Sequence, residues 1–348
     1  MGEQRRWRQR PPGSTWGDFG PDDERGRLNL LTREKVLQGV AEVREGRNFC
    51  LSLPLDYPGG NVLNPRRHPP RLAPTERGGR PNMNFPLNRE DPRLTDIVSD
   101  DQVLLTLQYS TQWDSLAHVG QMFDADGDGI AEFVYYNGFR AGEHVIGPVD
   151  YAHGDAPVAA PSGARRLGIE NMAAACVQGR GVMIDLAAHF GRERVLVGYD
   201  ALMAVMAKDG VVVEPGDMVC LHTGFAAMLL EMKGDPDPAQ AHGACAVLDG
   251  RDPKLLDWIT SSGLAVLIAD NYAVEAVPAR PCEEDHCASL PLHAHCLFRL
   301  GVHLGELWHL SELAAWLGAA RRSRFLLTAP PLRLPGAVGS PVTPIAAV

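Results

Sequence analysis

The sequence predicts a mixed α/β fold, in which helices flank a sheet with partly parallel strands. After residue 170, short apolar strand-like runs alternate with segments of helical periodicity, which is the order typical of such sheets. Apolar residues make up 45% of the 348 residues. A chain of this length and composition can bury a substantial core.

The chain is predicted to begin with an N-terminal segment and a helix, residues 1–48, followed by a catalytic domain over residues 49–348. Thr32 is suited to cap a helix that runs to about Glu45, because its hydroxyl can accept a hydrogen bond from the first turn. The apolar face expected to pack inward consists of Val36, Leu37, Val40 and Val43. Residues 53–100 are rich in proline and lack a clean period, which favours a long ordered excursion that covers a site.

The later elements follow one another closely. Strands are expected at Gly181–Asp185, Met218–His222, Leu264–Asp270 and Arg324–Thr328, and helices after a cap at Asp200, from Asp252, and over Ser311–Ala320. The proline-rich tail, residues 329–348, should be extended.

Charge and cysteine content narrow the class of function. The formal net charge of −10 argues against nucleic-acid binding and suits small-molecule chemistry in the cytoplasm. The arginine-rich start lacks the apolar region of a secretory signal, and no apolar run reaches the ~20 residues that span a bilayer. The seven scattered cysteines are expected to be reduced thiols.

Polar side chains are concentrated between Gln108 and His118. They follow the apolar run Val103–Leu107, which we interpret as a buried strand. Because buried polar atoms cost stability unless something satisfies them, either a ligand or a hydrogen-bond network is expected here.

Two other segments each match part of a known type of metal site. Asp124, Asp126 and Asp128 match the start of a calcium loop, but Tyr135 stands where a bidentate Glu is needed, so a surface turn is the favoured interpretation. Six potential ligands lie in one later stretch: Cys282, His286, Cys287, His293, His295 and Cys296. Their spacing lacks the paired pattern of structural zinc sites, which favours a solvated loop.

Glu306 lies in an otherwise apolar stretch and needs a partner. Taken alone, it would be expected to pair with an arginine such as Arg299 or to cap a neighbouring helix.

Several motifs together resemble the putative cyclase family, which includes bacterial kynurenine formamidase and isatin hydrolase. The family signature His-x-Gly-Thr-His-x-Asp-x-Pro-x-His aligns with Gln108-Tyr-Ser-Thr-Gln112-Trp-Asp114-Ser-Leu-Ala-His118. Further matches are 215–224, the 293–306 stretch, and N- and C-terminal segments like those of a longer subfamily whose signature carries glutamines. The resemblance implies a swivelling β/β/α fold and a homodimer or homotetramer.

The resemblance also implies roles for individual residues. Gln108 and Gln112 occupy the positions of two histidine ligands, Asp114 that of the bridging carboxylate, and His118 that of the acid/base. The second-metal pair matches His293 and Glu306, with His295 as the alternative histidine.

The two glutamines change the expected metal chemistry. A carboxamide oxygen is a weak, hard ligand compared with imidazole, so the replacements should remove much of the affinity for zinc at the first position. Asp114, His293 and Glu306 remain a plausible set for one zinc or manganese ion.

Three functions remain open on this basis. The first is a metal-assisted hydrolase of an amide, formamide or cyclic amide, in which Gln108, Gln112, Trp113, Tyr136 and Asn137 contact a ring-containing substrate. The second is a metal-independent cyclase, dehydratase or isomerase that uses His118 with Asp114 or Glu306. The third is a non-catalytic binding protein.

Overall fold

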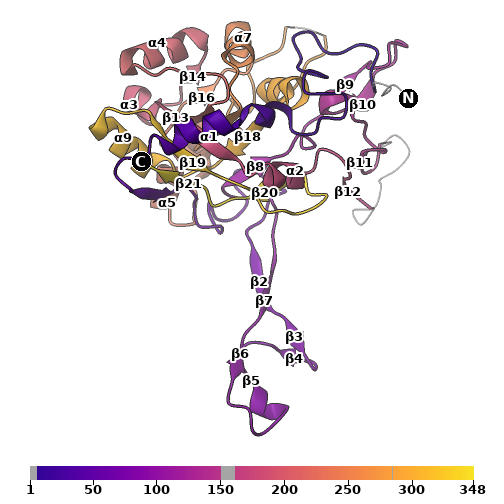
Figure 1. Ribbon diagram of the computed structural model, residues 1–348, viewed down its shortest axis with the longest axis vertical. Helices are drawn as coiled ribbons and strands as arrows, with labels where there is room; N and C mark the ends of the chain where they lie inside the picture. Colours follow the sequence, from indigo (N-terminus) through magenta and orange to yellow (C-terminus); the bar gives the residue numbers. More distant parts are fainter. Residues whose placement is uncertain (1–5, 150–160, 284) are drawn as a thin grey trace.

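A nine-stranded mixed sheet forms the centre of the molecule (Figure 1), with strand order β1-β21-β19-β13-β15-β17-β18-β8-β20. The computed structural model describes residues 6–149, 161–283 and 285–348. The strands of this sheet are β1 (Asn48–Cys50), β8 (Gln112–Asp114), β13 (Gln178–Asp185), β15 (Met218–His222), β17 (Val266–Ala269), β18 (His303–Glu306), β19 (Arg324–Thr328), β20 (Gly339–Pro341) and β21 (Ile345–Ala347). Strands β13, β15, β17 and β18 are parallel to one another, which confirms the predicted fold class.

Helices cover both faces of the sheet. They are α1 (Arg33–Val40), α2 (Ile169–Ala174), α3 (Ala187–Phe190), α4 (Tyr199–Asp209), α5 (Phe225–Glu231), α6 (Pro238–Gly243), α7 (Pro253–Ser262), α8 (Pro291–His293) and α9 (Ser311–Ala320), with a π-helical turn η4 (Ala294–Leu300). Short 3-10 turns lie at η1 (Gly26–Leu30), η2 (Leu87–Arg89) and η3 (Tyr136–Gly138). Successive side chains of β13 point to opposite faces of the sheet. Val182 and Ile184 pack with residues of α4 and α7 in one hydrophobic cluster, whereas Met183 packs with residues of α2 and α9 in another.

The remaining strands form two-stranded ribbons. They are β2 (Arg71–Pro74) with β7 (Asp101–Leu104), β3 (Glu76–Arg77) with β4 (Arg80–Pro81), β5 (Phe85–Pro86) with β6 (Ile97–Val98), β9 (Gln121–Phe123) with β10 (Glu132–Val134), β11 (Val145–Ile146) with β12 (Gly163–Ala164), and β14 (Leu196–Val197) with β16 (Val247–Leu248).

Most elements predicted after residue 170 are present where expected. Asp252 caps α7 by accepting hydrogen bonds from the amides of Lys254 and Leu255. The predicted cap at Asp200 is wrong by two residues, because Gly198 is the N-cap of α4 and Asp200 lies in the first turn.

Helix α1 begins after Thr32 as predicted, but its buried face differs from the predicted one. The Thr32 side chain accepts a hydrogen bond from the Lys35 amide. Leu37 and Val40 are exposed, whereas Lys35 and Gly39 are buried. Gly39 lies so close to the sheet that a β-carbon there would meet the Gly179 carbonyl oxygen at 2.6 Å. Close backbone approach and the ion pair of Lys35 with Asp217 therefore determine which face packs inward.

The predicted buried strand at Val103–Leu107 is also wrong. Residues 101–104 form β7, which pairs with β2 in an exposed ribbon. This ribbon is the stalk of a long arm, residues 71–104, that projects away from the body (Figure 1). An apolar run alone does not distinguish a core strand from such a stalk.

Cys282 and Cys287 form a disulfide, so the expectation that all seven cysteines are reduced is wrong for this pair. Cys50, Cys176, Cys220, Cys245 and Cys296 are free. Across the described part of the chain, every helix is too short or too polar to cross a bilayer.

Candidate metal-binding site

Three predicted residues meet at one edge of the central sheet. Ligand atoms of Asp114, His293 and Glu306 all lie within 4.8 Å of one another, and all three residues are buried. His293 Nε2 is 3.3 Å from Glu306 Oε1 and 3.9 Å from Asp114 Oδ2. His118 borders the cluster, with its Nε2 3.7 Å from Asp114 Oδ1.

The pairing of β8 with β18 produces this arrangement. In their antiparallel register Gln112 lies opposite Glu306 and Asp114 lies opposite Leu304. Side chains two residues apart on a strand point to the same face, so Gln112 and Asp114 both point toward Glu306. Gln112 Nε2 donates a hydrogen bond of 2.9 Å to Glu306 Oε2.

Asp114 lacks any hydrogen-bond partner. Both of its carboxylate oxygens are buried without one, and so is Gln112 Oε1. An unpartnered buried carboxylate is costly, since nothing replaces the water that it has lost. A divalent cation among Asp114, His293 and Glu306 would compensate these oxygen atoms, so the residues present fit a metal ion.

Burial and charge act in opposite directions on the three groups. Burial raises the pKa of Asp114 despite the nearby His118. Burial would also raise the pKa of Glu306, but the hydrogen bond and charge of His293, helped by Arg67, lower it overall. Burial would lower the pKa of His293, yet hydrogen bonds to Glu275 and Glu306 raise it to about 10.

Glu275 orients His293, and sequence reasoning did not identify it. Its Oε1 lies 2.8 Å from His293 Nδ1 and accepts a hydrogen bond from the His293 amide at 3.0 Å. Its Oε2 accepts from the Leu292 amide. A carboxylate that accepts a hydrogen bond from one ring N–H of a histidine leaves the other ring nitrogen free to bind a metal. Glu275 lies 18 residues before His293 in a loop, so no spacing pattern in the sequence indicates this contact.

A cavity of about 540 Å³ opens onto the cluster. His118, His293 and Glu306 form its polar end. Apolar and aromatic side chains line much of the remainder, including Leu63, Tyr109, Tyr272, Val277, Leu290 and Leu307. This volume lies within the range of small-molecule binding sites.

Arg67 and His242 are two further lining residues that sequence reasoning missed. Arg67 lies at the base of the arm, where its Nη1 is 3.9 Å from Glu306 Oε2 and donates to the Gln108 carbonyl oxygen at 2.9 Å. His242 Nδ1 is 3.0 Å from the hydroxyl of Tyr272, which fixes that ring at the cavity wall. The proline-rich residues 53–100 were predicted to cover a site, but the sequence does not indicate which of their side chains reaches it.

Three residues expected to contact substrate lie away from the cavity. Trp113 is fully buried on the opposite face of β8, where it packs against Trp308 at a centroid distance of 5.0 Å. The alternation that points Gln112 and Asp114 toward the site necessarily points Trp113 away from it. Tyr136 and Asn137 are buried beside the N-terminal segment, and the Asn137 amide donates to the carbonyl oxygens of residues 20, 21 and 23.

The remaining candidates can also be placed. The Gln108 carbonyl oxygen accepts from Arg67, and its side chain approaches Gly339 rather than the cavity. His295 is hydrogen-bonded to Thr260, so the structure brings His293 and not His295 to the cluster. Glu306 pairs with His293 and Arg67 instead of the proposed Arg299.

Apart from His293, the residues of the two weaker metal motifs do not join the cluster. The disulfide between Cys282 and Cys287 removes two thiolates from any zinc site in that loop. Asp124, Asp126 and Asp128 lie close together in a turn where Asp124 accepts hydrogen bonds from the amides of Gly127 and Gly129.

Comparison with known proteins identifies the family. A family model described as Putative cyclase matches residues 51–276. A crystal structure of a novel cyclase is 30% identical with a TM-score of 0.70, and the match covers 96% of this chain and 99% of that chain. The chain therefore belongs to the putative cyclase family, a family of enzymes.

More distant structures share the fold. Isatin hydrolase A from Labrenzia aggregata, bound to benzyl benzoate, is 13% identical with a TM-score of 0.52, and the match covers 86% of this chain and 93% of that one. An isatin hydrolase bound to the product analogue thioisatinate is 15% identical with a TM-score of 0.52, and the match covers 91% and 99%. A search of curated proteins found no match.

Proposed function

We propose that the protein is a metal-assisted hydrolase that cleaves a carbon–nitrogen bond in a small, ring-containing amide, formamide or cyclic amide. Asp114, His293 and Glu306 would hold the metal ion, and His118 would move protons. The observation that carries this proposal is the pair of unpartnered Asp114 oxygens in a cluster that borders a cavity of about 540 Å³.

The chemistry that a bound divalent cation would supply is polarisation of a carbonyl group and acidification of water. The donor set is rich in oxygen, since Gln112 Oε1 also lies buried without a partner. Carboxylate and amide oxygens suit manganese, whereas more imidazole ligands would favour zinc. We therefore expect the site to accept manganese as well as zinc, with zinc bound more tightly at equal free concentration.

The protein's own residues would prepare the site for this reaction. Glu275 holds the His293 ring with Nε2 directed at the cluster. His118 lines the cavity, and its side chain is 21% exposed, so it can contact both substrate and solvent. An imidazole in this position can accept a proton from water and deliver it to the leaving nitrogen.

The isatin hydrolases of similar fold support a cyclic amide as the first substrate to test. The aromatic rings of Tyr109 and Tyr272 at the cavity wall can contact a flat ring, which would bring its carbonyl toward the polar end.

The experiment is metal analysis of the purified protein, followed by a panel of formamides, aryl amides and cyclic amides. The panel is assayed as purified, after chelation, and after addition of manganese or zinc. We expect about one metal ion per chain, loss of turnover on chelation, and recovery with added metal. His118→Ala should lower turnover on the order of 10²-fold or more without loss of metal. Turnover that His118→Ala leaves unchanged would contradict its role.

A specific observation favours a second candidate, a metal-independent cyclase, dehydratase or isomerase. Glu306 already accepts a hydrogen bond from Gln112 and lies 3.3 Å from His293 and 3.9 Å from Arg67, so this carboxylate is compensated without a cation. His118 and Asp114 would then serve as the acid/base pair. Full activity in a metal-free protein would establish this candidate and exclude the first.

A further inference from the structure

The cavity beside the cluster differs in charge from the chain as a whole. The chain has a formal net charge of −10. Among the described residues that line the cavity, Arg66 and Arg67 are basic and Glu306 is the one acid. Glu306 is already compensated, because it accepts a hydrogen bond from Gln112 and lies 3.3 Å from His293 Nε2. Positive charge on a largely apolar wall attracts anions, so the lining favours an anionic ligand.

A tight turn, residues 64–67, holds Arg67 at the cavity wall. The Arg67 amide donates to the Asn64 carbonyl oxygen at 3.0 Å, and the Arg66 amide donates to Asn64 Oδ1 at 3.1 Å. Pro65 stands at the second position of the turn, where its fixed φ suits the backbone. The backbone that carries Arg67 is therefore ordered before a ligand binds, which lowers the entropic cost of binding.

The segment before this turn is anchored in a similar way. The Tyr109 hydroxyl accepts a hydrogen bond from the Gly59 amide at 3.0 Å, and His242 Nε2 lies 3.0 Å from the Val62 carbonyl oxygen. Tyr109 and His242 themselves line the cavity. The wall that presents the two arginines is thus attached to the body of the molecule at several points.

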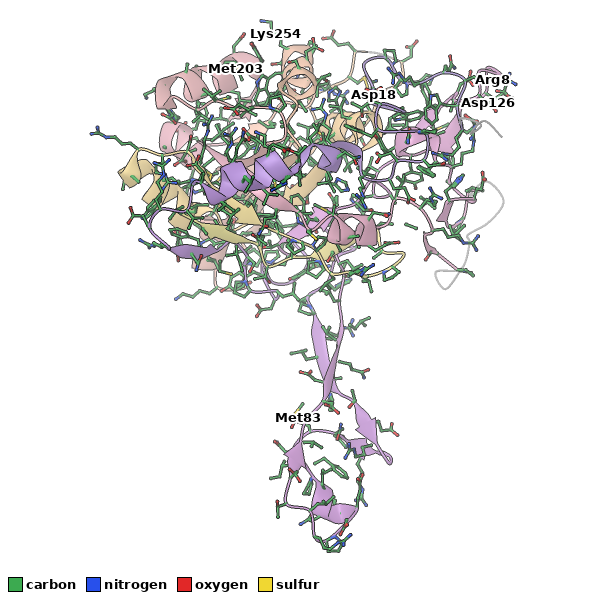
Figure 2. All side chains as sticks on the ribbon, in the orientation of Figure 1. Arg8, Asp18, Met83, Asp126, Met203 and Lys254 are labelled. Atoms are coloured by element: carbon green, nitrogen blue, oxygen red, sulfur yellow. A yellow bond between two sulfur atoms is a disulfide. The ribbon has the colours of Figure 1, made fainter. Side chains whose placement is uncertain are left out.

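The arm, residues 71–104, does not contribute to this wall. None of its residues lines the cavity, and it projects away from the body (Figure 1). Figure 2 shows Met83 in the distal part of the arm, far from the central sheet. The arginines that face the cavity from this region are therefore residues 66 and 67, before the arm begins.

The Arg67 guanidinium has donor groups available to a ligand. Its Nη1 donates to the Gln108 carbonyl oxygen at 2.9 Å and lies 3.9 Å from Glu306 Oε2. Within the described parts of the chain, its Nε and Nη2 donate to no protein atom, and the side chain is 23% exposed. A guanidinium edge of this kind matches a carboxylate through two parallel hydrogen bonds. The contacts of Nη1 hold the group in place, and the other edge can bind a ligand.

We propose that Arg67 determines substrate specificity by binding a carboxylate group on the ring of the substrate. This inference rests on the proposed function, because it names the substrate class of the same cavity, an amide or cyclic amide whose ring carries a carboxylate. The apolar wall would contact the ring. Arg67 lies close enough to Glu306 for the carboxylate and the amide to occupy neighbouring positions. Arg66, which is exposed, adds attraction without a fixed contact.

The test is calorimetric titration of chelator-treated protein with benzoate and with benzyl alcohol, an uncharged ring of similar size. We expect benzoate to bind at least ~10-fold more tightly, because a bidentate charged pair adds to the same ring contacts. Arg67→Met keeps an apolar stem and should remove this preference. Arg67→Lys should keep only part of it, since an ammonium group is a point charge without the planar fork. Arg71→Met is the matched control, because Arg71 is an exposed arginine outside the cavity, and it should bind like the wild type.

This titration involves no turnover, so its outcome is distinguishable from that of the proposed function. Equal affinity of the wild type for the two ligands, or a preference that Arg67→Met leaves intact, would overturn the proposal even if the protein hydrolyses amides. A preference that Arg67→Met removes supports the carboxylate site even if no amide is turned over, and in that case the proposed function alone fails.

Steady-state kinetics test whether the carboxylate belongs to the substrate. With metal added, we expect Arg67→Met to raise the KM of a ring-carboxylated amide at least ~10-fold more than the KM of its uncharged parent amide. Hydrolysis of a cyclic amide also creates a carboxylate, which can bind Arg67 as product. A variant that weakens inhibition by product but raises both KM values equally would assign Arg67 to the product and contradict the proposal.

Discussion

Asp114 and Asp217 are both fully buried aspartates, yet their surroundings are opposite. Asp217 Oδ1 accepts hydrogen bonds from Lys35 Nζ at 2.9 Å and Arg180 Nε at 2.8 Å. Its Oδ2 accepts from Arg180 Nη2 and from the Glu214 amide. Asp114 accepts none, and the two imidazole rings beside it, those of His118 and His293, lie 3.7 Å and 3.9 Å away.

The difference shows that burial of a charge does not by itself indicate a site. Asp217 is a structural ion that connects α1 to the sheet through Lys35, because its partners replace every hydrogen bond that water would make. Asp114 is, among the described residues, the carboxylate with both oxygens buried and unpartnered. Such a group is retained at a cost to stability, which is expected where it serves a ligand.

Replacement of Asp114 should produce the largest change in activity. Asp114→Asn keeps the size of the side chain but removes its charge, so we expect turnover to fall on the order of 10³-fold with loss of bound metal. The unfolding free energy of the metal-free protein should stay within ~1 kcal/mol or rise, since an unpaired buried charge is removed. Steady-state kinetics, metal analysis and urea denaturation measure the three quantities, and a large loss of metal-free stability would show that Asp114 is structural.

Replacement of Asp217 should lower stability and leave turnover nearly unchanged, the opposite of what is expected for Asp114. Asp217→Asn leaves Lys35 and Arg180 buried with reduced compensation, so we expect a loss of ~3 kcal/mol in unfolding free energy by urea denaturation. Turnover per folded molecule should change little. The control is Asp200→Asn, whose side chain is 82% exposed in its pair with Lys254 and should cost under ~0.5 kcal/mol. If Asp217→Asn and Asp200→Asn lost the same unfolding free energy, Asp217 would not be a structural ion of the kind described.

The sequence predicted which residues form the cluster better than it predicted which residues line the cavity. Asp114 and His118 follow from the aligned signature, and His293 and Glu306 follow from a second stretch that resembles the family. The pairing of β8 with β18 brings Asp114 and Glu306 close to each other. Trp113 was misplaced because the boundaries of its strand were not known. A shift of one residue in a strand reverses the face to which a side chain points.

The features that could not be predicted depend on contacts between distant segments. The Lys35 side chain points inward from α1 because it forms an ion pair with Asp217, which lies far along the chain. Val103 lies in an exposed stalk rather than a core strand because it pairs with Leu72 and not with the central sheet. Composition and periodicity describe the sequence near a residue, whereas pairing of this kind is determined by tertiary structure.

Replacement of Glu275 tests whether Asp114 needs a correctly oriented His293 beside it. Glu275→Gln retains hydrogen-bonding capacity but removes the charge behind the ring, so we expect metal affinity to fall ~10- to 100-fold. Turnover at saturating metal should recover most of its wild-type value, which separates a positioning role from a structural one. A titration of turnover against metal concentration makes the measurement, with Asp114→Asn as the variant that added metal should not restore.

The smallest expected effect concerns a partly exposed pair, Asp185 and His222, whose side chains are 27% and 11% exposed and meet at 2.7 Å. Burial would lower the pKa of His222, but the hydrogen bond to Asp185 and the charges of Asp270 and Asp185 raise it, so this stability is lost as pH rises through the folded-state value. Burial would raise the pKa of Asp185, but the hydrogen bond to His222 lowers it, so its contribution is lost only as pH falls through that lowered value. The pair should therefore stabilise the fold most near pH ~5, between the ordinary values of the two groups.

Asp185→Asn should accordingly cost ~1 kcal/mol near pH ~5 and less near pH ~9. Urea denaturation at the two pH values measures this difference, with Asp200→Asn, whose side chain is 82% exposed, as the control for an exposed carboxylate. A cost that does not change with pH would mean that Asp185 acts through its hydrogen bond to the Ala188 amide rather than through the charge of His222. In that case a partnered carboxylate would stabilise this fold through backbone contacts alone, and the contrast with the unpartnered Asp114 would concern hydrogen bonding rather than charge.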